Sequence, residues 1–220
     1  MKYNIIGSSS KGNAIIVEDK ILLDCGVTYI KLKSYLKDIK LIFISHVHKD
    51  HLLPPTIKKI SYNYPTIKFL TGSVEVVKKL KELNVPSKNV IYIPNHFWYD
   101  IGIAKIKLEK LEHDTPNYAL LFEYKGKKCA YIVDTASVEN IEAKNYDLYL
   151  IESNYKRDIL EEHLLNCEEE DRIYLERVPL THLAYEAAND FLINNMGNNS
   201  SFEYIHQSSY NFKEENNGII

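Results

Sequence analysis

Short apolar runs separated by turn-forming residues recur along the first hundred residues. Runs of four to six residues bounded in this way are typical of buried strands. We therefore expect strands at 3–7, 14–17, 21–26, 41–44, 68–71 and 90–93. Apolar positions at helical spacing lie between several of these runs, which predicts helices at 29–36 and 54–60 and a third from the cap residue Ser73 to about Leu83. Alternating strands and helices indicate a layered α/β arrangement.

The second half of the chain has a different pattern. Alternating apolar positions joined by short turns predict strands at 104–111, 118–124, 129–133 and 148–151. Helical periodicity returns between 158 and 195, a last strand is expected at 202–205, and the polar tail 213–218 is expected to fray. Because no linker, repeat or low-complexity block interrupts the sequence, we expect a single domain over residues 1–220.

Composition narrows the functional classes. The 220 residues are 45% hydrophobic and 26% charged, as in an ordinary globular domain. No apolar run approaches the ~20 residues of a membrane span, and the N-terminus does not resemble a signal peptide. Three widely spaced cysteines without C-x-x-C spacing favour free thiols and a cytoplasmic location. The net charge of −3 argues against coating nucleic acid by bulk electrostatics, although an anionic substrate at a local site stays open. Seventeen tyrosines can support a homodimer face or base stacking, but most are expected in strands and core.

The strongest chemical signal is the segment 45–51, which reads S-H-V-H-K-D-H directly after an apolar strand. Residues two apart in extended chain project to the same face, so His46 and His48 can bind one metal ion. Asp50 and His51 follow at the turn and can face a second ion. Imidazole and carboxylate ligands without thiolate suit zinc, manganese or iron. A chance cluster of loop histidines is disfavoured because the serine, the strand and the acidic residue agree.

A two-metal site needs further ligands, which we expect at other strand ends. His113 follows the strand 104–111 and can complete the first ion. Asp134 follows the strand 129–133 and can bridge the two ions with its two oxygens. His206 ends the final strand and can complete the second ion. Asp24 also lies at a strand end, where its carboxylate can brace a neighbouring loop. Each residue alone fits a surface role, whereas their joint placement predicts ligands.

Two further residues suggest chemistry beyond metal binding. Glu152 follows a nearly all-apolar strand, and His182 precedes a predicted helix at 184–193. A histidine near a helix N-terminus is well placed to meet a phosphate oxygen, and Glu152 can orient it. We expect Asp50, His182 and Glu152 to take part in catalysis. We leave out His96, in an aromatic loop, and His163, in a glutamate-rich helix.

These motifs resemble the metallo-β-lactamase fold hydrolases over nearly the whole chain. The segment 7–13, G-S-S-S-K-G-N, resembles the opening of the YycJ/WalJ-like branch, a relative of ribonuclease Z. E-S-N-Y at 152–155, T-H-L at 181–183 and H-Q-S at 206–208 are similar to later segments of that branch. Val47 stands where glutamate is common, a departure expected to have little effect. Departures at Thr181, Ala184 and Gln207 bear on the shape of the substrate pocket more than on the metal chemistry.

The resemblance implies an αββα sandwich of two mixed sheets flanked by helices, with two divalent ions, Zn²⁺ or Mn²⁺, at one edge. It implies that Asp134 bridges the ions, that Asp24 supports the site and that His182 lies beside a scissile phosphate. The resemblance also implies that His46, His48 and His113 hold one ion and that Asp50, His51 and His206 hold the other.

The function implied is metal-dependent hydrolysis of phosphodiester bonds. A nuclease acting on DNA or RNA is favoured by the branch resemblance, with single-stranded nucleic acid as a substrate. A cyclic-nucleotide phosphodiesterase is the alternative, favoured by the small size and net charge. No Gly/Pro-rich arm is visible, which disfavours transfer-RNA maturation. A lactamase or thioesterase gives His182 and Glu152 no clear role, and a non-catalytic scaffold would have little need of an intact ligand set.

Overall fold

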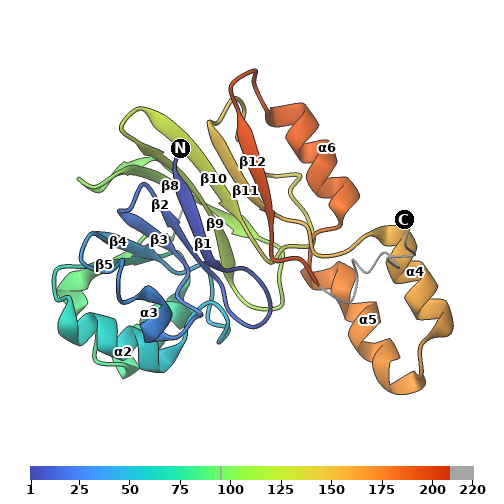
Figure 1. Cartoon of the computed structure of the whole chain (residues 1–220), viewed down its shortest axis with the longest axis horizontal. Coiled ribbons are helices and arrows are strands. Elements are labelled where there is room, and N and C mark those ends of the chain that lie inside the picture. The colour runs from blue at the N-terminus through green and yellow to red at the C-terminus, as the bar shows by residue number, and fades with distance from the viewer. Residues whose placement is uncertain (95, 209–220) are drawn as a thin grey trace, which may run out of the picture.

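A computed structural model describes residues 1–94 and 96–208. The first half of the chain forms a six-stranded mixed sheet in the order β1-β2-β3-β4-β5-β6 (Figure 1). Pairing is antiparallel from β1 to β3 and parallel from β3 to β6. The strands are β1 (Tyr3–Gly7), β2 (Ala14–Val17), β3 (Ile21–Leu23), β4 (Leu41–Phe43), β5 (Lys68–Thr71) and β6 (Val90–Tyr92).

The second half forms another six-stranded sheet, in the order β12-β11-β10-β9-β8-β7. Strands β7 to β10 pair antiparallel, whereas β10, β11 and β12 pair in parallel. This sheet is therefore mixed as well. Its strands are β7 (Tyr99–Asp100), β8 (Lys105–Leu111), β9 (Asn117–Tyr124), β10 (Lys127–Ile132), β11 (Leu148–Glu152) and β12 (Ser201–Ile205).

The two sheets pack face to face over an apolar core. In β9, Leu120 and Phe122 point into this core, whereas Ala119 and Leu121 belong to the cluster on the outer face of the second sheet. The two-residue period of a strand explains this division, since successive side chains point to opposite faces. Strands buried on both faces read as continuous apolar runs, as the sequence of β9 does.

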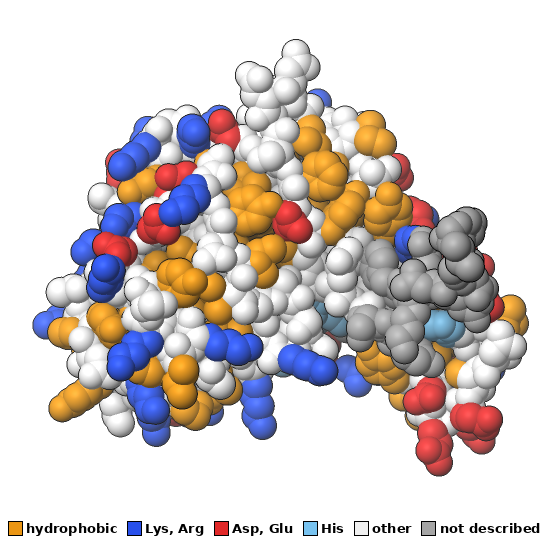
Figure 2. Space-filling view, viewed as in Figure 1, with side chains coloured by type: hydrophobic (Ala, Val, Ile, Leu, Met, Phe, Trp, Pro, Cys, Tyr) orange, Lys and Arg blue, Asp and Glu red, His pale blue; other side chains and the backbone are white. Residues whose placement is uncertain are grey.

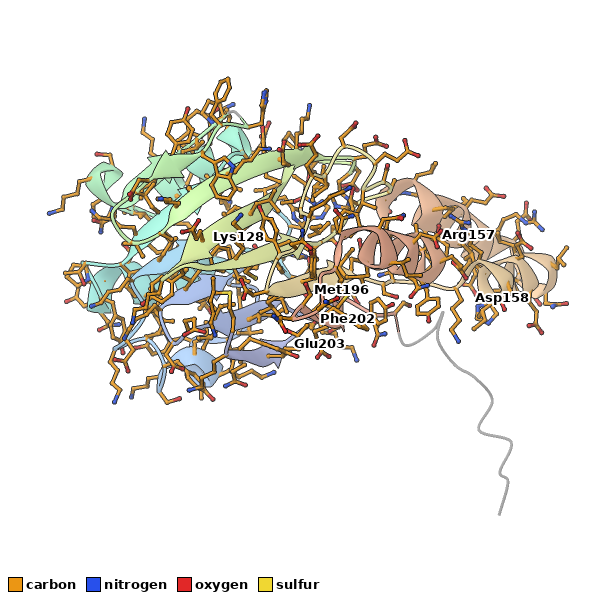
Figure 3. The ribbon with its side chains drawn as sticks, turned by 90° about the horizontal axis from the view of Figure 1, so that it is seen from above. Lys128, Arg157, Asp158, Met196, Phe202 and Glu203 are labelled. Atoms are coloured by element: carbon orange, nitrogen blue, oxygen red, sulfur yellow. The ribbon has the colours of Figure 1, made fainter. Side chains whose placement is uncertain are left out.

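Helices cover the outer faces. Helices α1 (Tyr29–Leu32), α2 (Pro54–Asn63) and α3 (Val74–Glu82) share an apolar cluster with the outer face of the first sheet. Helix α6 (Tyr185–Asn195) packs on the second sheet. The hairpin of α4 (Arg157–Asn166) and α5 (Glu169–Thr181) extends beyond the edge of the sandwich (Figures 1 and 3). The expected αββα sandwich is thus confirmed, and a short 3₁₀ turn at Ser87–Asn89 completes the described elements.

The structure differs from the sequence expectations mainly at element ends. Strand β3 stops at Leu23 because Asp24 adopts a left-handed backbone conformation with φ 57°. Helix α1 ends at Leu32, four residues early, and the two-residue strand β7 has no sequence signal of its own. The expected fraying of 213–218 lies outside the described residues. Among those described, no helix has the length and apolarity to cross a membrane.

Candidate metal centre and adjoining pocket

The candidate site lies where strand ends of both sheets meet. The first sheet contributes the segment after β4, in which His46 and His51 are buried. The second sheet contributes His113 after β8, Asp134 after β10 and His206 after β12. Strands β8, β10 and β12 run in the same direction, so their carboxyl ends lie at the same edge of the sheet and bring together side chains distant in sequence. Burial of so many ionisable groups requires compensation by charge or by ligation.

Three histidine rings surround a common centre. The ring centroids of His46, His48 and His113 lie 4.7, 4.9 and 5.2 Å apart, with interplanar angles of 70–76°. One nitrogen from each ring lies within 4.8 Å of the other two. Burial lowers the pKa of His46 well below its ordinary value, with the neighbouring His51 adding to the effect, and burial also lowers the pKa of His113. The rings of His46 and His113 are therefore neutral at pH 7, the form in which imidazole binds a metal.

A second group contains Asp50, His51, Asp134 and His206. Asp134 Oδ2 lies 2.8 Å from Nε2 of His51, and Asp134 Oδ1 lies 3.0 Å from Nε2 of His206. Burial by itself raises the pKa of Asp134, but the neighbouring His206 and His51 outweigh it and hold the pKa well below its usual range. The carboxylate is therefore ionised and available to a cation.

Asp134 also contacts the histidine trio, since its Oδ2 lies 3.4 Å from Nε2 of His46. Two buried atoms here, His46 Nε2 and Asp134 Oδ1, form no hydrogen bond among the described residues, and their polar contacts are ion-pair distances, such as 3.4 Å from His46 Nε2 to Asp134 Oδ2 and 3.0 Å from Asp134 Oδ1 to His206 Nε2. Buried polar atoms are almost always hydrogen-bonded, so two atoms that face a shared space without a hydrogen bond are available to a cation. The donor set of imidazoles and carboxylates fits divalent cations such as zinc or manganese.

Asp24 supports this arrangement from beneath. Its Oδ2 lies 2.6 Å from Nδ1 of His51, and it accepts hydrogen bonds from the backbone and hydroxyl of Ser45 and from the Tyr131 hydroxyl. With Nδ1 of His51 engaged by Asp24, Nε2 is directed toward Asp134 and is the nitrogen available to a metal. The bracing role expected for Asp24 therefore has a defined geometry.

Asn13, in the loop between β1 and β2, also positions candidate ligands through its side-chain amide. Its amide nitrogen lies 3.2 Å from Asp50 Oδ2 and 2.9 Å from His51 Nε2, and its amide oxygen lies 3.1 Å from His206 Nδ1. Sequence reasoning assigned no role to Asn13, although it closes the G-S-S-S-K-G-N segment. An amide seldom attracts notice in a search for metal ligands, and only the contacts reveal it.

Three residues of the site adopt a left-handed backbone although none is glycine. Asp24, Asp134 and His206 have φ values of 57°, 52° and 53°. Each such residue costs of order 1–3 kcal/mol, which the surrounding structure must offset. The three lie directly after β3, close to the end of β10 and directly after β12, where the reversal of backbone direction turns each side chain toward the centre.

The buried Glu152 and the partly exposed His182 form a pair beside Asp134. Glu152 Oε1 lies 2.7 Å from Nδ1 of His182, and this nitrogen also lies 3.3 Å from Asp134 Oδ1. Glu152 is fully buried, and its other oxygen accepts hydrogen bonds from the backbone N–H groups of Thr135 and Leu183. Burial by itself lowers the pKa of His182, but the charges of Glu152 and Asp134 outweigh it and raise the pKa to about 10.

His182 occupies a junction between two helices. Its backbone N–H donates to the carbonyl of Val178 and closes α5, and α6 begins three residues later at Tyr185. The expectation that it precedes a helix is correct, and it also caps the preceding one. His96 is exposed, and His163 lies in α4, so neither belongs to the groups that could hold a metal in the described part of the chain.

Two adjoining cavities open over the site, with volumes of about 400 and 270 Å³. Tyr174 lines both of them, and Arg177, Val178 and Thr181 line the second. These residues recur at helical spacing, so one face of α5 forms the pocket wall. Arg177 pairs with Asp114 at 3.3 Å, and Asp114 in turn lies 3.4 Å from His48 Nε2. Sequence reasoning missed Tyr174 and Arg177 because the position of the hairpin depends on tertiary packing, and it assigned no role to Asp114, whose partner Arg177 comes from that hairpin.

Fold and site together define the metallo-β-lactamase class of αββα proteins. The family model described as "Beta-lactamase superfamily domain" matches residues 19–171, which is more than half of the chain, and the chain belongs to this family. A curated relative is the inactive cytidine monophosphate-N-acetylneuraminic acid hydroxylase of Homo sapiens, 34% identical over 98 residues. That alignment covers 43% of this chain and 20% of the relative, so the chain spans about a fifth of the relative's length.

Solved structures share the fold at low sequence identity. YhfI from Bacillus subtilis has a TM-score of 0.69 at 15% identity, covering 93% of this chain and 85% of its own. The short form of human tRNase Z has a TM-score of 0.67 at 16% identity, covering 95% and 93%. Zn²⁺-bound PqqB from Methylobacterium extorquens has a TM-score of 0.64 at 11% identity, covering 96% and 90%. Identities this low bear on the fold alone.

Proposed function

We propose that the chain is a metal-dependent phosphodiesterase of the metallo-β-lactamase fold, formed as one domain over residues 1–220. His46, His48 and His113 would hold one divalent ion, zinc or manganese, and Asp50, His51 and His206 would hold a second. Asp134, whose carboxylate contacts both groups, would serve as a ligand to both ions. Ions in such a site activate water for attack and neutralise charge on phosphate oxygens. The zinc in PqqB supports zinc as one of the candidates.

The pairing of His182 with Glu152 is the main observation in favour of a phosphodiester substrate over a lactam or thioester. His182 faces both cavities, and the raised pKa keeps its imidazole protonated at neutral pH. A protonated imidazole next to the bridging carboxylate can bind a phosphate oxygen and protonate the departing alkoxide. Glu152 holds the ring by Nδ1, which leaves Nε2 to face the substrate. Hydrolysis of a lactam or thioester gives this pair no comparable task.

The substrate we favour is single-stranded nucleic acid, with a cyclic nucleotide as the alternative, because the resemblance to the YycJ/WalJ-like branch favours a DNA or RNA nuclease. Tyr174 can stack on a base in either case. The similarity to human tRNase Z, an enzyme named for its action on transfer RNA, supports a phosphodiester substrate for this chain. The thiols of Cys25 and Cys129 are free and buried, which supports a cytoplasmic location. The 17 tyrosines could supply the contact face of a homodimer.

The direct test is turnover of bis(p-nitrophenyl) phosphate by zinc- or manganese-loaded protein, with the Asp134→Ala variant alongside. We expect turnover by the native protein and none by the variant. Two bound ions without turnover would favour acyl or lactam hydrolysis instead. Absence of both metal and turnover would favour a non-catalytic scaffold and would reject the proposal.

A further inference from the structure

Charge is distributed unevenly along this weakly acidic chain. Residues 1–100 contain 15 lysines and 8 acidic residues, whereas residues 101–220 contain 12 basic and 22 acidic residues. The first sheet and its helices therefore form a basic half, and the second half of the chain is acidic. Figure 2 shows basic side chains along the lower edge of the first half and acidic ones gathered at the lower right. A net charge of −3 conceals this separation.

A third cavity lies on the basic side of the metal centre. Its volume is about 450 Å³, and its lining includes Lys11, Lys31, Lys49 and Asp50. The three lysines come from the first loop, from α1 and from the H-x-H-x-D-H segment, so separate parts of the chain place their charges around one space. Within residues 1–94 and 96–208, none of these three ammonium groups forms an ion pair with a carboxylate, and all three residues are exposed.

The floor of this cavity is backbone at close quarters. A Cβ on Gly26 would lie 1.6 Å from the carbonyl oxygen of Asp50, so only glycine allows the two segments to meet. This contact places the lysine cavity next to the metal-ligand segment. The close packing of Gly26 against Asp50 therefore fixes the position of the cavity relative to the metal centre.

The third cavity adjoins the pocket over the metal centre. Ser10 lines all three cavities, and Asp50 lines both the second and the third. A substrate with one phosphate at the metal centre can therefore extend across the Ser10 loop and place its next phosphates among the lysines. A cyclic nucleotide carries one phosphate and has no group to place there. A strand of nucleic acid carries one negative charge per nucleotide, and lysines bind such charges with release of counterions.

We propose that Lys11, Lys31 and Lys49 bind the phosphate backbone of a single-stranded nucleic acid next to its scissile bond. This inference rests on the proposed function, because it extends the same site. It makes a strand of several nucleotides, rather than a cyclic nucleotide, the substrate class. The three lysines bind and position the strand, and the ions and His182 act on it.

The test compares binding of a phosphorothioate oligothymidylate, which keeps its charge but resists hydrolysis, by native protein and by a Lys11→Gln/Lys31→Gln/Lys49→Gln variant. Loss of three contacts to a single strand should lower the slope of log K against log salt by about 2. Affinity at low salt should fall roughly tenfold or more. Replacing the same lysines by arginine should restore both values.

A matched control removes the same charge elsewhere. Lys78, Lys81 and Lys88 are exposed in and after α3 and line none of the three cavities. The Lys78→Gln/Lys81→Gln/Lys88→Gln variant should bind like the native protein. Lys49 lies between the candidate ligands His48 and Asp50, so metal content is measured for each variant. A Lys11→Gln/Lys31→Gln variant leaves this segment unchanged and should show about two thirds of the change in slope.

Unchanged affinity and slope in the triple variant would overturn the inference, as would an equal loss in the control. Preference of the native protein for 3′,5′-cyclic nucleotides, undiminished in the triple variant, would also overturn it while the proposed phosphodiesterase stands. Failure of bis(p-nitrophenyl) phosphate turnover would reject the proposed function separately, because the binding measurement needs no catalysis.

Discussion

Glu152 holds His182 in place through a 2.7 Å contact between Oε1 and Nδ1, while its other oxygen is fixed by two backbone amides. The carboxylate is fixed in position, because Glu152 is fully buried and both amide donors belong to buried residues. Orientation and protonation of His182 therefore depend on a single acidic side chain from β11. That dependence makes the proposed acid testable without touching a metal ligand.

Replacing Glu152 with glutamine should reduce kcat for phosphodiester hydrolysis by about 10²-fold, the lower range for loss of a positioned proton donor. KM should change little if His182 acts on the leaving group. Steady-state kinetics with leaving groups of different basicity measure the effect, which should be largest for poor leaving groups. The exposed Glu139→Gln variant provides a control with the same change of charge. An equal loss for all leaving groups would contradict the proton-donor role.

The raised pKa of His182 predicts a pH dependence of stability in metal-free protein. The folded pKa of about 10 exceeds the unfolded value of ~6.5. The stabilisation is therefore fully present below pH ~6.5 and is lost as pH rises through about 10. Urea unfolding in a chelator should show this loss, and His182→Gln should reduce it. Nuclear magnetic resonance titration gives a direct check, since a deprotonated ring at pH 8 would contradict the prediction.

Asp134→Ala and His46→Ala should each abolish turnover, since each removes a ligand that reaches the shared space between the two groups. Metal analysis should show loss of at least one ion per chain. Asp158→Asn, on α4 beyond the sandwich (Figure 3), should keep native metal content and activity. Native metal content in both ligand variants would contradict the proposed coordination.

Asp24→Asn should weaken metal binding by about 10- to 100-fold, as is usual when a partner that orients a ligand is changed. The reason is that Asp24 fixes the Nδ1 side of His51 and thereby the nitrogen offered to the ion. Competition with a chromophoric chelator measures the affinity. At saturating metal, activity should largely recover, in contrast to the Asp134 variant.

Tyr174→Ala should raise KM roughly tenfold for a substrate with a nucleoside, the loss expected for one stacked base. Thymidine 5′-(p-nitrophenyl phosphate) and methyl p-nitrophenyl phosphate share a leaving group and differ in the nucleoside, so their ratio isolates stacking. Tyr174→Phe should keep the native ratio. An equal loss on both substrates would place Tyr174 against the leaving group or in a structural role.

Local sequence patterns predicted the layered α/β elements and the strand-end residues of the centre, and the family resemblance implied the sandwich. Apolar alternation places β9 and β10 correctly, and the strand-end positions of His113, Asp134 and His206 follow from those elements. Their roles as ligands stay predictions. Residues such as Tyr174 and Arg177 were beyond reach, because their relation to the site depends on how the α4–α5 hairpin packs. Local pattern also could not show that Asp24 ends β3 through a left-handed turn.

The candidate ligands come from both sheets, with His46, His48, Asp50 and His51 on one side and His113, Asp134 and His206 on the other. Ions bound between them would therefore cross-link the two layers of the sandwich. Separation of the sheets would then require release of the ions, and a ligand at one hundred times its Kd adds about 2.7 kcal/mol to the free energy of unfolding. In a cell, metal supply would thus control the lifetime of the folded protein as well as its catalytic rate.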